Sequence, residues 1–210
     1  MNNYTEVAHP SAPSAPHPEL AHGAPTTHSF PLADKHGRVW ATLNLTCLER
    51  PEFGSKHLPY VLEGEKLTGS LDLDLAEETR IKSVKVSLIG EQPTNLDLEP
   101  EQFVKVTQVL WPADGSDGAS SHSSVSDVEH HKLKGTFHWP FELALPVTAE
   151  FTGHDGKKET RPLPSSSHAA DKKVHVDYRI EAKIHHGSLL HFTDDIIDSN
   201  IIYFAGTPQE

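Results

Sequence analysis

The segment from Val174 to Ile184 reads VHVDYRIEAKI and decides the fold class of this chain. Apolar or aromatic residues occupy every second position, and polar or charged residues fill the positions between them. The first set is Val174, Val176, Tyr178, Ile180, Ala182 and Ile184. Successive side chains of a β-strand point to opposite faces, whereas a helix would scatter both sets around its axis. The segment therefore predicts a strand with one buried face.

The same period of two recurs along the chain. Leu67–Leu75 and Val84–Leu88 alternate in this way, and so does Phe137–Leu145, where the central Pro140 predicts an edge position or a break. Weaker strand candidates are Val39–Leu48, Phe103–Trp111 and Ile196–Phe204. The sequence shows no convincing amphipathic helix, and Gly and Pro separate the alternating runs. Short strands with turn signals between them predict an all-β fold, an antiparallel β-sandwich.

Composition divides the chain into one domain and several polar segments. Residues 1–31 hold six of the 16 prolines and are expected to form a disordered Pro/His/Ala-rich tail. The sandwich domain is expected over 32–206, followed by a short tail at 207–210. Within the domain, residues 112–131 and 152–171 are poor in apolar residues, which predicts two long surface loops.

Charge and cysteine content exclude several classes of protein. With 18 Lys and Arg against 30 Asp and Glu, the net charge of −12 argues against a nucleic-acid-binding protein. The single cysteine, Cys47, cannot form an intramolecular disulfide, which suits a reducing compartment. The chain has no apolar stretch long enough for a transmembrane helix, and its first thirty residues lack the apolar region of a secretory signal. These features predict a cytoplasmic protein.

The sequence contains no motif that indicates a metal site. The 16 histidines include two adjacent pairs, but adjacent side chains on a strand point to opposite faces, and the His-x-His spacing of a strand chelate is absent. Asp72 and Asp74 share one face of a predicted strand and could serve as an acid/base pair or bind calcium. Further oxygen ligands and a turn glycine are missing, so a solvated outer face is favoured. No metal ligand is predicted.

No catalytic residue or cofactor site is predicted either. The Gly-x-Ser-x-Gly elbow, the phosphate-binding loop and the dinucleotide fingerprint are absent. Cys47 lies inside a predicted strand, where a buried and inert thiol is expected. The chain is therefore predicted not to be an enzyme. The discriminating observation for a hydrolase would be a pocket that holds a Ser or Cys within hydrogen-bond reach of a His.

Two groups of residues are candidates for binding or regulation. A set of lysines could contact phosphates or anionic lipid heads if its members cluster, although solvated faces that discourage edge aggregation explain it as well. This set is Lys82, Lys85, Lys132 and Lys134. A serine-rich segment followed by acidic residues offers candidate phosphorylation sites. These are Ser123, Ser124 and Ser126.

Four segments, in this order and spacing, together resemble the N-terminal domain of arrestins, most closely the α-arrestin-like proteins of fungi. They are Gly64–Gly69 (GEKLTG), Ile81–Glu91 (IKSVKVSLIGE), Gly135–Pro146 (GTFHWPFELALP) and Val176–Ile184 (VDYRIEAKI). The resemblance covers roughly residues 39–205. It implies an immunoglobulin-like sandwich that acts as a non-catalytic adaptor or scaffold in membrane-protein trafficking, endocytosis or signalling.

The implied partners are cytoplasmic parts of membrane proteins and a ubiquitin ligase, with the protein peripheral at the plasma membrane or endosomes. The chain departs from the family pattern in three respects: it lacks the Pro-Pro-x-Tyr motif by which many relatives recruit a ligase, the sequence ends at Glu210 where relatives usually carry a second sandwich, and the 113–131 loop is long and unusually polar. Self-association and pairing with a second arrestin-like domain both stay open. The alternative function is a β-sandwich that binds a small molecule, a lipid or a metal, which the histidines and lysines suggest.

Overall fold

The computed structural model describes residues 25–48, 58–92, 100–111, 132–153, 156–168, 175–187 and 192–206. These residues contain eleven β-strands and no helix, so the predicted all-β class is confirmed. The strands are β1 (Pro25–Ala33), β2 (Val39–Leu48), β3 (Tyr60–Leu62), β4 (Lys66–Gln92), β5 (Glu101–Trp111), β6 (Lys132–Ala144), β7 (Thr148–Thr152), β8 (Lys158–Pro162), β9 (Ser167–His168), β10 (His175–Gly187) and β11 (Phe192–Phe204).

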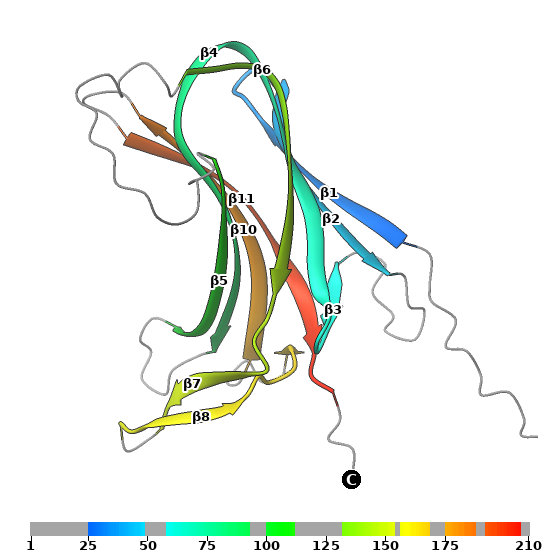
Figure 1. Cartoon of the computed structure of the whole chain (residues 1–210), viewed down its shortest axis with the longest axis vertical. Coiled ribbons are helices and arrows are strands. Elements are labelled where there is room, and N and C mark those ends of the chain that lie inside the picture. Colours follow the sequence, from blue (N-terminus) through cyan, green and yellow to red (C-terminus); the bar gives the residue numbers. More distant parts are fainter. Residues whose placement is uncertain are drawn as a thin grey trace, which may run out of the picture.

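The 27-residue strand β4 organises the fold. Its first half pairs with β2 and β6, and its second half pairs with β10 and β5. The strand curves over one end of the molecule together with β6 (Figure 1). The sequence predicted two separate strands here, Leu67–Leu75 and Val84–Leu88. The structure joins them, because the segment between them continues the ladder with β6 through an irregularity after Leu75.

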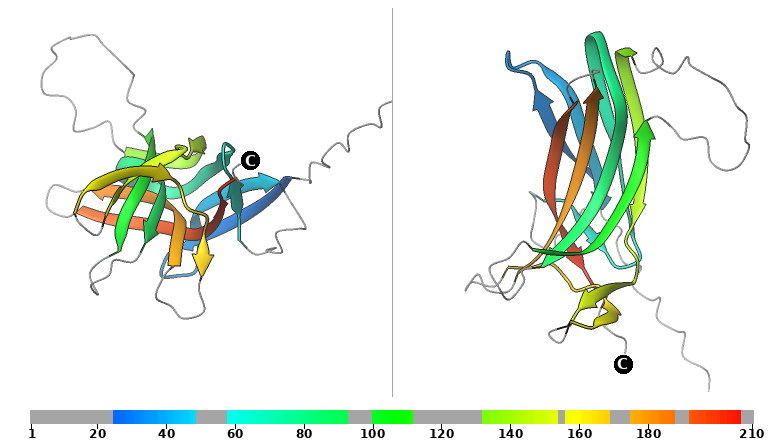
Figure 2. Two further views of the ribbon diagram at one scale, coloured as in Figure 1. Left: turned by 90° about the horizontal axis from the view of Figure 1, so that it is seen from below. Right: turned by 90° about the vertical axis from the view of Figure 1, so that its left-hand side faces the viewer.

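Nine strands form one mixed sheet that curls into a half-barrel, and β7 and β8 form a separate hairpin. The sheet is mixed because β11 pairs with β3 in parallel, while the other pairings are antiparallel. Figure 2 shows the curvature from two further sides, with the hairpin at the lower end in its right-hand view. The sandwich type within the all-β class stays a prediction.

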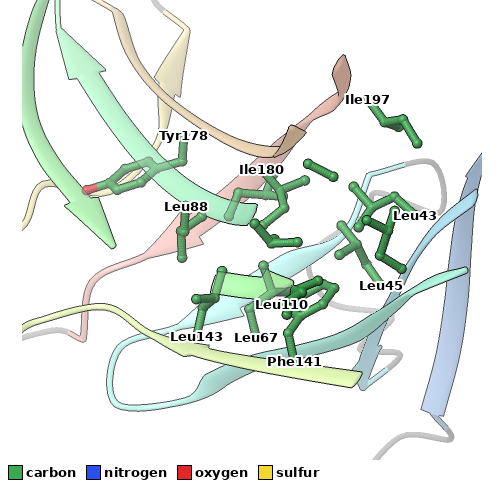
Figure 3. Packing of buried hydrophobic residues seen from close by; sticks show 14 of the residues in the cluster. Leu43, Leu45, Leu67, Leu88, Leu110, Phe141, Leu143, Tyr178, Ile180 and Ile197 are labelled. Carbon is green, nitrogen blue, oxygen red and sulfur yellow. The ribbon is translucent and has the colours of Figure 1, made fainter. Parts of the chain in front are cut away.

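The buried faces of the strands meet inside the curl. The alternation read from the Val174–Ile184 segment is confirmed in β10, where Tyr178, Ile180, Ala182 and Ile184 are all 1% exposed or less. Side chains from several strands converge on this core (Figure 3), including Leu43, Leu45, Leu67, Leu88, Phe141 and Leu143. Burying this apolar surface is the main favourable term in the stability of the domain.

Pro140 lies within β6, opposite Ser70 of β4, and does not break the strand. Among the described strands β6 pairs with β4 alone, so the predicted edge position is confirmed. A proline is tolerated there because a strand edge need not donate a ladder hydrogen bond. Nearby, the backbone N–H of Glu142 donates to Oε1 of Gln108 on β5, at 3.0 Å. This bond joins β6, which pairs mainly with the first half of β4, to β5, which pairs with the second half.

The weaker strand candidates at 39–48, 103–111 and 196–204 are confirmed as β2, β5 and β11, but the N-terminal boundary is wrong. The structure places β1 at Pro25–Ala33, inside the segment expected to be disordered up to residue 31. Its inward positions include Phe30 and Leu32, which pack against the core and supply the burial that fixes the strand. The other inward positions of β1 hold Thr26 and His28, so apolar residues do not mark the whole inward face. Residues 1–24 and 207–210 lie outside the described residues.

The loop expected over residues 152–171 is also partly ordered as strands. The hairpin of β7 and β8 spans Thr148–Pro162, and β9 pairs with the start of β10. The buried ring of Phe151 anchors the hairpin by stacking on Phe103, with 5.1 Å between centroids. Leu163, just after β8, is also buried, so two apolar side chains anchor this otherwise polar segment to the core. The loop expected at 112–131 lies outside the described residues.

An aromatic chain continues from Phe151 and Phe103 into the core. Phe103 meets Tyr178 edge-on at 5.6 Å, and Tyr178 meets Tyr203 at 4.9 Å between ring centroids. The hydroxyl of Tyr178 donates to the backbone carbonyl of Pro164 at 2.7 Å. The ring chain and this hydrogen bond hold the segment after β8 against the end of the sheet.

Candidate interaction surfaces

The strand β1 presents an open backbone edge. Among the described strands it pairs only with β2. Backbone groups of a strand alternate between the two sides, and prolines are tolerated where the missing N–H would face away from the partner. Pro25 and Pro31 therefore face away from β2. Thr27 and Ser29 lie at every second position between them and face the same way. The N–H and C=O groups of Thr27 and Ser29 therefore face the open side.

A row of polar side chains crosses the outer face and fixes this edge to the rest of the sheet. The hydroxyl of Ser29 donates to Asn44 Oδ1 at 2.6 Å, and Asn44 Nδ2 donates to Asp72 Oδ2 at 2.6 Å. Asp72 is also hydrogen-bonded through Oδ1 to His138 Nδ1 on β6. The row connects β1, β2, β4 and β6. Asp72 thus forms part of a structural network, while Asp74 pairs with Arg38 at 3.0 Å.

The structure places the four predicted lysines on two strands. Lys82 and Lys85 belong to β4; the stem of Lys82 lies against Gly187, and Lys85 is exposed opposite Lys183 of β10. Lys132 and Lys134 are exposed on β6. Anion binding by these lysines stays a prediction.

Lys132 forms an ion pair with a carboxylate: its Nζ lies 3.3 Å from Oε2 of Glu78. The three serines proposed as phosphorylation sites, Ser123, Ser124 and Ser126, lie outside the described residues.

Two histidine–carboxylate pairs link the end of β10 to the start of β11. His185 Nδ1 is 2.6 Å from Asp194 Oδ1, and His186 Nε2 is 2.9 Å from Asp195 Oδ2. The second oxygen of Asp194 accepts from Lys183 Nζ at 2.6 Å. The hydrogen bonds from Lys183 and then from His185 lower the pKa of Asp194, so this carboxylate stays charged at neutral pH.

A hollow of about 740 Å³ opens beside the His186–Asp195 pair, at the end where the β1–β2 turn meets β4, β10 and β11. The ring of Trp40 on its wall meets His186 edge-on, with 5.8 Å between centroids. The remaining lining carries charges of both signs, including Asp34, Lys35, Arg38, Asp74, Glu77 and Asp195. A polar small molecule is the class of ligand that such a lining suits.

Cys47 lies within reach of a histidine, the discriminating geometry for a hydrolase. Its Sγ is 3.4 Å from Nε2 of His28, and Cys47 also lines a small pocket with Tyr60 and Glu65. Burial raises the pKa of the Cys47 thiol and lowers the pKa of His28. Both groups are therefore neutral at pH 7, and among the described residues no carboxylate orients the ring of His28. An activated nucleophile needs the opposite shift of the thiol or an oriented base.

Metal-ligating side chains do not gather in the part of the chain that the structure describes: no three His, Cys, Asp or Glu residues there could hold one ion. Within the same residues there is no helix of the length and apolarity needed to cross a membrane.

No protein-family model matches this chain, and no curated protein sequence matches it. The arrestin-like resemblance of the four segments therefore stays a prediction.

Proposed function

We propose that this protein is a non-catalytic, arrestin-like adaptor or scaffold that binds other proteins in membrane-protein trafficking, endocytosis or signalling. Its partners are cytoplasmic parts of membrane proteins, with or without a ubiquitin ligase, and it works in the cytoplasm or at the plasma membrane and endosomes. The observation that carries the binding role is the open backbone edge of β1 between Pro25 and Pro31. A partner's extended segment can add to such an edge as a further strand.

The path of β4 supports an immunoglobulin-like sandwich of the arrestin N-domain type. Its two halves carry different neighbours, β2 and β6 on one side and β10 and β5 on the other. Both groups of strands turn their apolar faces toward the same core. Two sheets that face each other across one core define a sandwich. The trafficking role itself comes from the resemblance of the four sequence segments.

The state of the Cys47–His28 pair supports a role without catalysis. Burial favours the neutral form of both groups, whereas a cysteine nucleophile reacts as the thiolate. The pair is better explained as part of the packing between β1 and β2, where it joins two neighbouring strands.

The test uses a proline at the open edge. Thr27→Pro removes one N–H from the free side of β1, at a position equivalent to the prolines already present, so pairing with β2 is retained. Thr27→Val is the matched control, because it keeps the N–H and loses only the hydroxyl. Affinity pull-down with mass spectrometry from native cytosol and detergent-solubilised membranes compares both variants with the wild type.

We expect wild type and Thr27→Val to recover the same partner, a transporter or receptor with or without a ligase, and Thr27→Pro to lose it. Urea denaturation should give similar stability for all three proteins. A pull-down without any reproducible protein partner would contradict the adaptor function. Equal recovery by Thr27→Pro would reject the edge as the binding surface.

The hollow beside Trp40 favours a second candidate function, binding of a small polar molecule. A ligand present at 100 times its dissociation constant should stabilise the domain by about 2.7 kcal/mol. A thermal-shift screen with polar metabolites measures this, and Trp40→Leu should remove the shift. If no metabolite shifts the Tm and a protein partner is recovered, the small-molecule function is rejected and the adaptor function is kept.

A further inference from the structure

We propose that the outer face of β5, β4, β10 and β11 is a second docking site, which binds a short extended segment of a partner protein with the pattern apolar-x-acidic-x-apolar. This surface lies on a different face from the β1 edge and goes beyond the function proposed above. It is defined by one cross-strand row, which is called here the lysine row. The row consists of Val109, Lys85, Lys183 and Ile196.

The register of three strand pairs aligns these four residues. Lys85 of β4 lies opposite Val109 of β5 and opposite Lys183 of β10, and Lys183 lies opposite Ile196 of β11. Their neighbours along the strands, such as Val86 and Ala182, point into the core and are fully buried. The lysine row therefore faces outward.

The ends of the row are unusual because they are apolar and exposed. Val109 is 39% exposed and Ile196 is 45% exposed, and they are two of the four large hydrophobic residues exposed in the described part of the chain. Single exposed apolar residues are common on protein surfaces. Here two of them lie at the ends of one row with two cations between them. Such a surface complements a ligand that has an apolar group at each end and a negative charge in the middle.

The centre of the row carries positive charge that its surroundings only partly balance. Lys85 and Lys183 are directly opposite, and like charges in this position are unfavourable. Asp194 balances Lys183, at 2.6 Å, and Glu181 of β10 adds a weaker attraction while it also pairs with Arg179. Lys85 makes no ion pair with any residue that the structure describes. A carboxylate placed between the two ammonium groups would relieve the repulsion.

Strand spacing specifies the shape of the ligand. Neighbouring strands lie about 4.8 Å apart, so the row extends about 14 Å from Val109 to Ile196, with the point midway between the lysines at about 7 Å. An extended chain rises about 3.4 Å per residue and sends every second side chain to the same face. Its first, third and fifth side chains then fall on Val109, between the lysines, and on Ile196.

Charge also selects a short segment as the occupant. The whole chain carries a net charge of −12, which repels long acidic tracts and anionic membranes at low ionic strength. One carboxylate matched to the two lysines keeps the local attraction. The flanking apolar side chains add the contact that a lone surface ion pair does not provide.

The experiment titrates the full chain, labelled with nitrogen-15, with a peptide whose core is Leu-Ser-Glu-Ser-Leu. We expect shifts of the backbone amide signals confined to the lysine row and its neighbours, with a Kd on the order of 0.1–1 mM. The same peptide with Gln in place of Glu should bind about 3- to 5-fold more weakly.

Variants assign the contacts. Lys85→Gln should weaken binding about 3- to 5-fold, and Ile196→Ser about 10-fold. Lys158→Gln and Val147→Ser are matched controls, because they change an exposed lysine and an exposed valine elsewhere, and they should leave binding unchanged. The unbound spectrum of each variant confirms that it is folded.

Three outcomes would overturn this proposal: no amide shifts at 2 mM peptide (about twice the weakest expected Kd), equal binding of the Gln peptide, or equal binding by Lys85→Gln. Vesicles that contain phosphatidylserine test the membrane as an alternative source of anions. Lys85-dependent vesicle binding without peptide binding would also reject the proposal. Thr27→Pro should bind the peptide normally, so failure at this face and failure at the β1 edge are distinguishable.

Discussion

Replacing Gly90 with alanine tests the packing at the centre of the fold. Gly90 lies in β4, opposite Val104 of β5 and Tyr178 of β10. A Cβ atom at this position would lie 2.7 Å from Cε2 of Phe103 and 2.7 Å from Cγ1 of Val104. The backbone of Gly90 does not have a positive φ, so alanine adds no backbone strain. The effect of Gly90→Ala is therefore a matter of side-chain packing.

The magnitude follows from these contacts. Carbon atoms pack best at about 3.5–4.0 Å, so the Phe103 ring and the Val104 side chain must each move by about 1 Å. Overpacking of this kind costs about 1–3 kcal/mol. Alanine also stabilises the protein by about 0.4–1 kcal/mol, because it lowers the conformational entropy of the unfolded chain. We expect Gly90→Ala to lower the free energy of unfolding by about 1–2 kcal/mol.

A double-mutant cycle identifies the ring as the cause. Phe103→Leu removes the ring that obstructs the new methyl group, so adding Gly90→Ala to Phe103→Leu should cost less than it does in the wild type. The coupling free energy should be at least about 0.5 kcal/mol. Urea denaturation followed by tryptophan fluorescence and far-ultraviolet circular dichroism measures all four proteins. Additive effects, or a Gly90→Ala protein as stable as the wild type, would refute the packing argument.

Two further predictions concern polar contacts. Tyr178→Phe should lower the free energy of unfolding by about 1–2 kcal/mol in urea, because the carbonyl of Pro164 loses its 2.7 Å donor; an unchanged midpoint would contradict this. Hydrogen bonds from Lys183 and His185 lower the pKa of Asp194, so its contribution to stability is full above the ordinary Asp range and is lost as the pH falls through the lowered pKa. Asp194→Asn should therefore flatten the acid side of a plot of Tm against pH between about 5 and 3, and an unaltered plot would count against the pair.

Periodicity predicted the strands that bury one full face. The alternation is nearly continuous in β10 and in the Leu67–Leu75 part of β4, and the structure has strands at both places. Strands that bury fewer apolar side chains gave a weaker signal. β1 alternates partly through Thr26 and His28, and the β7–β8 hairpin packs through Phe151, so the sequence pattern predicts a tail up to residue 31 and a loop over 152–171 instead. Neither strand carries enough apolar residues to be recognised before its partner is known.

The candidate surfaces were less accessible to sequence reasoning. Lys85 was predicted as a binding residue, but Lys183 and Ile196 were not, because they lie about 100 residues further along the chain. The open edge of β1 was missed for a similar reason. Whether a strand lies at an edge depends on which strands pair with it, and Pro31 alone did not show it.

The sequence by itself determined the all-β class and which face of the main strands is buried, because side-chain alternation is a local property of the backbone. Only the tertiary structure decided that β4 continues through both groups of strands, that β1 has an open side, and that Val109, Lys85, Lys183 and Ile196 form one row. These features depend on strand order and register. Both are set by the packing of distant segments around one core, which no local pattern of residues specifies.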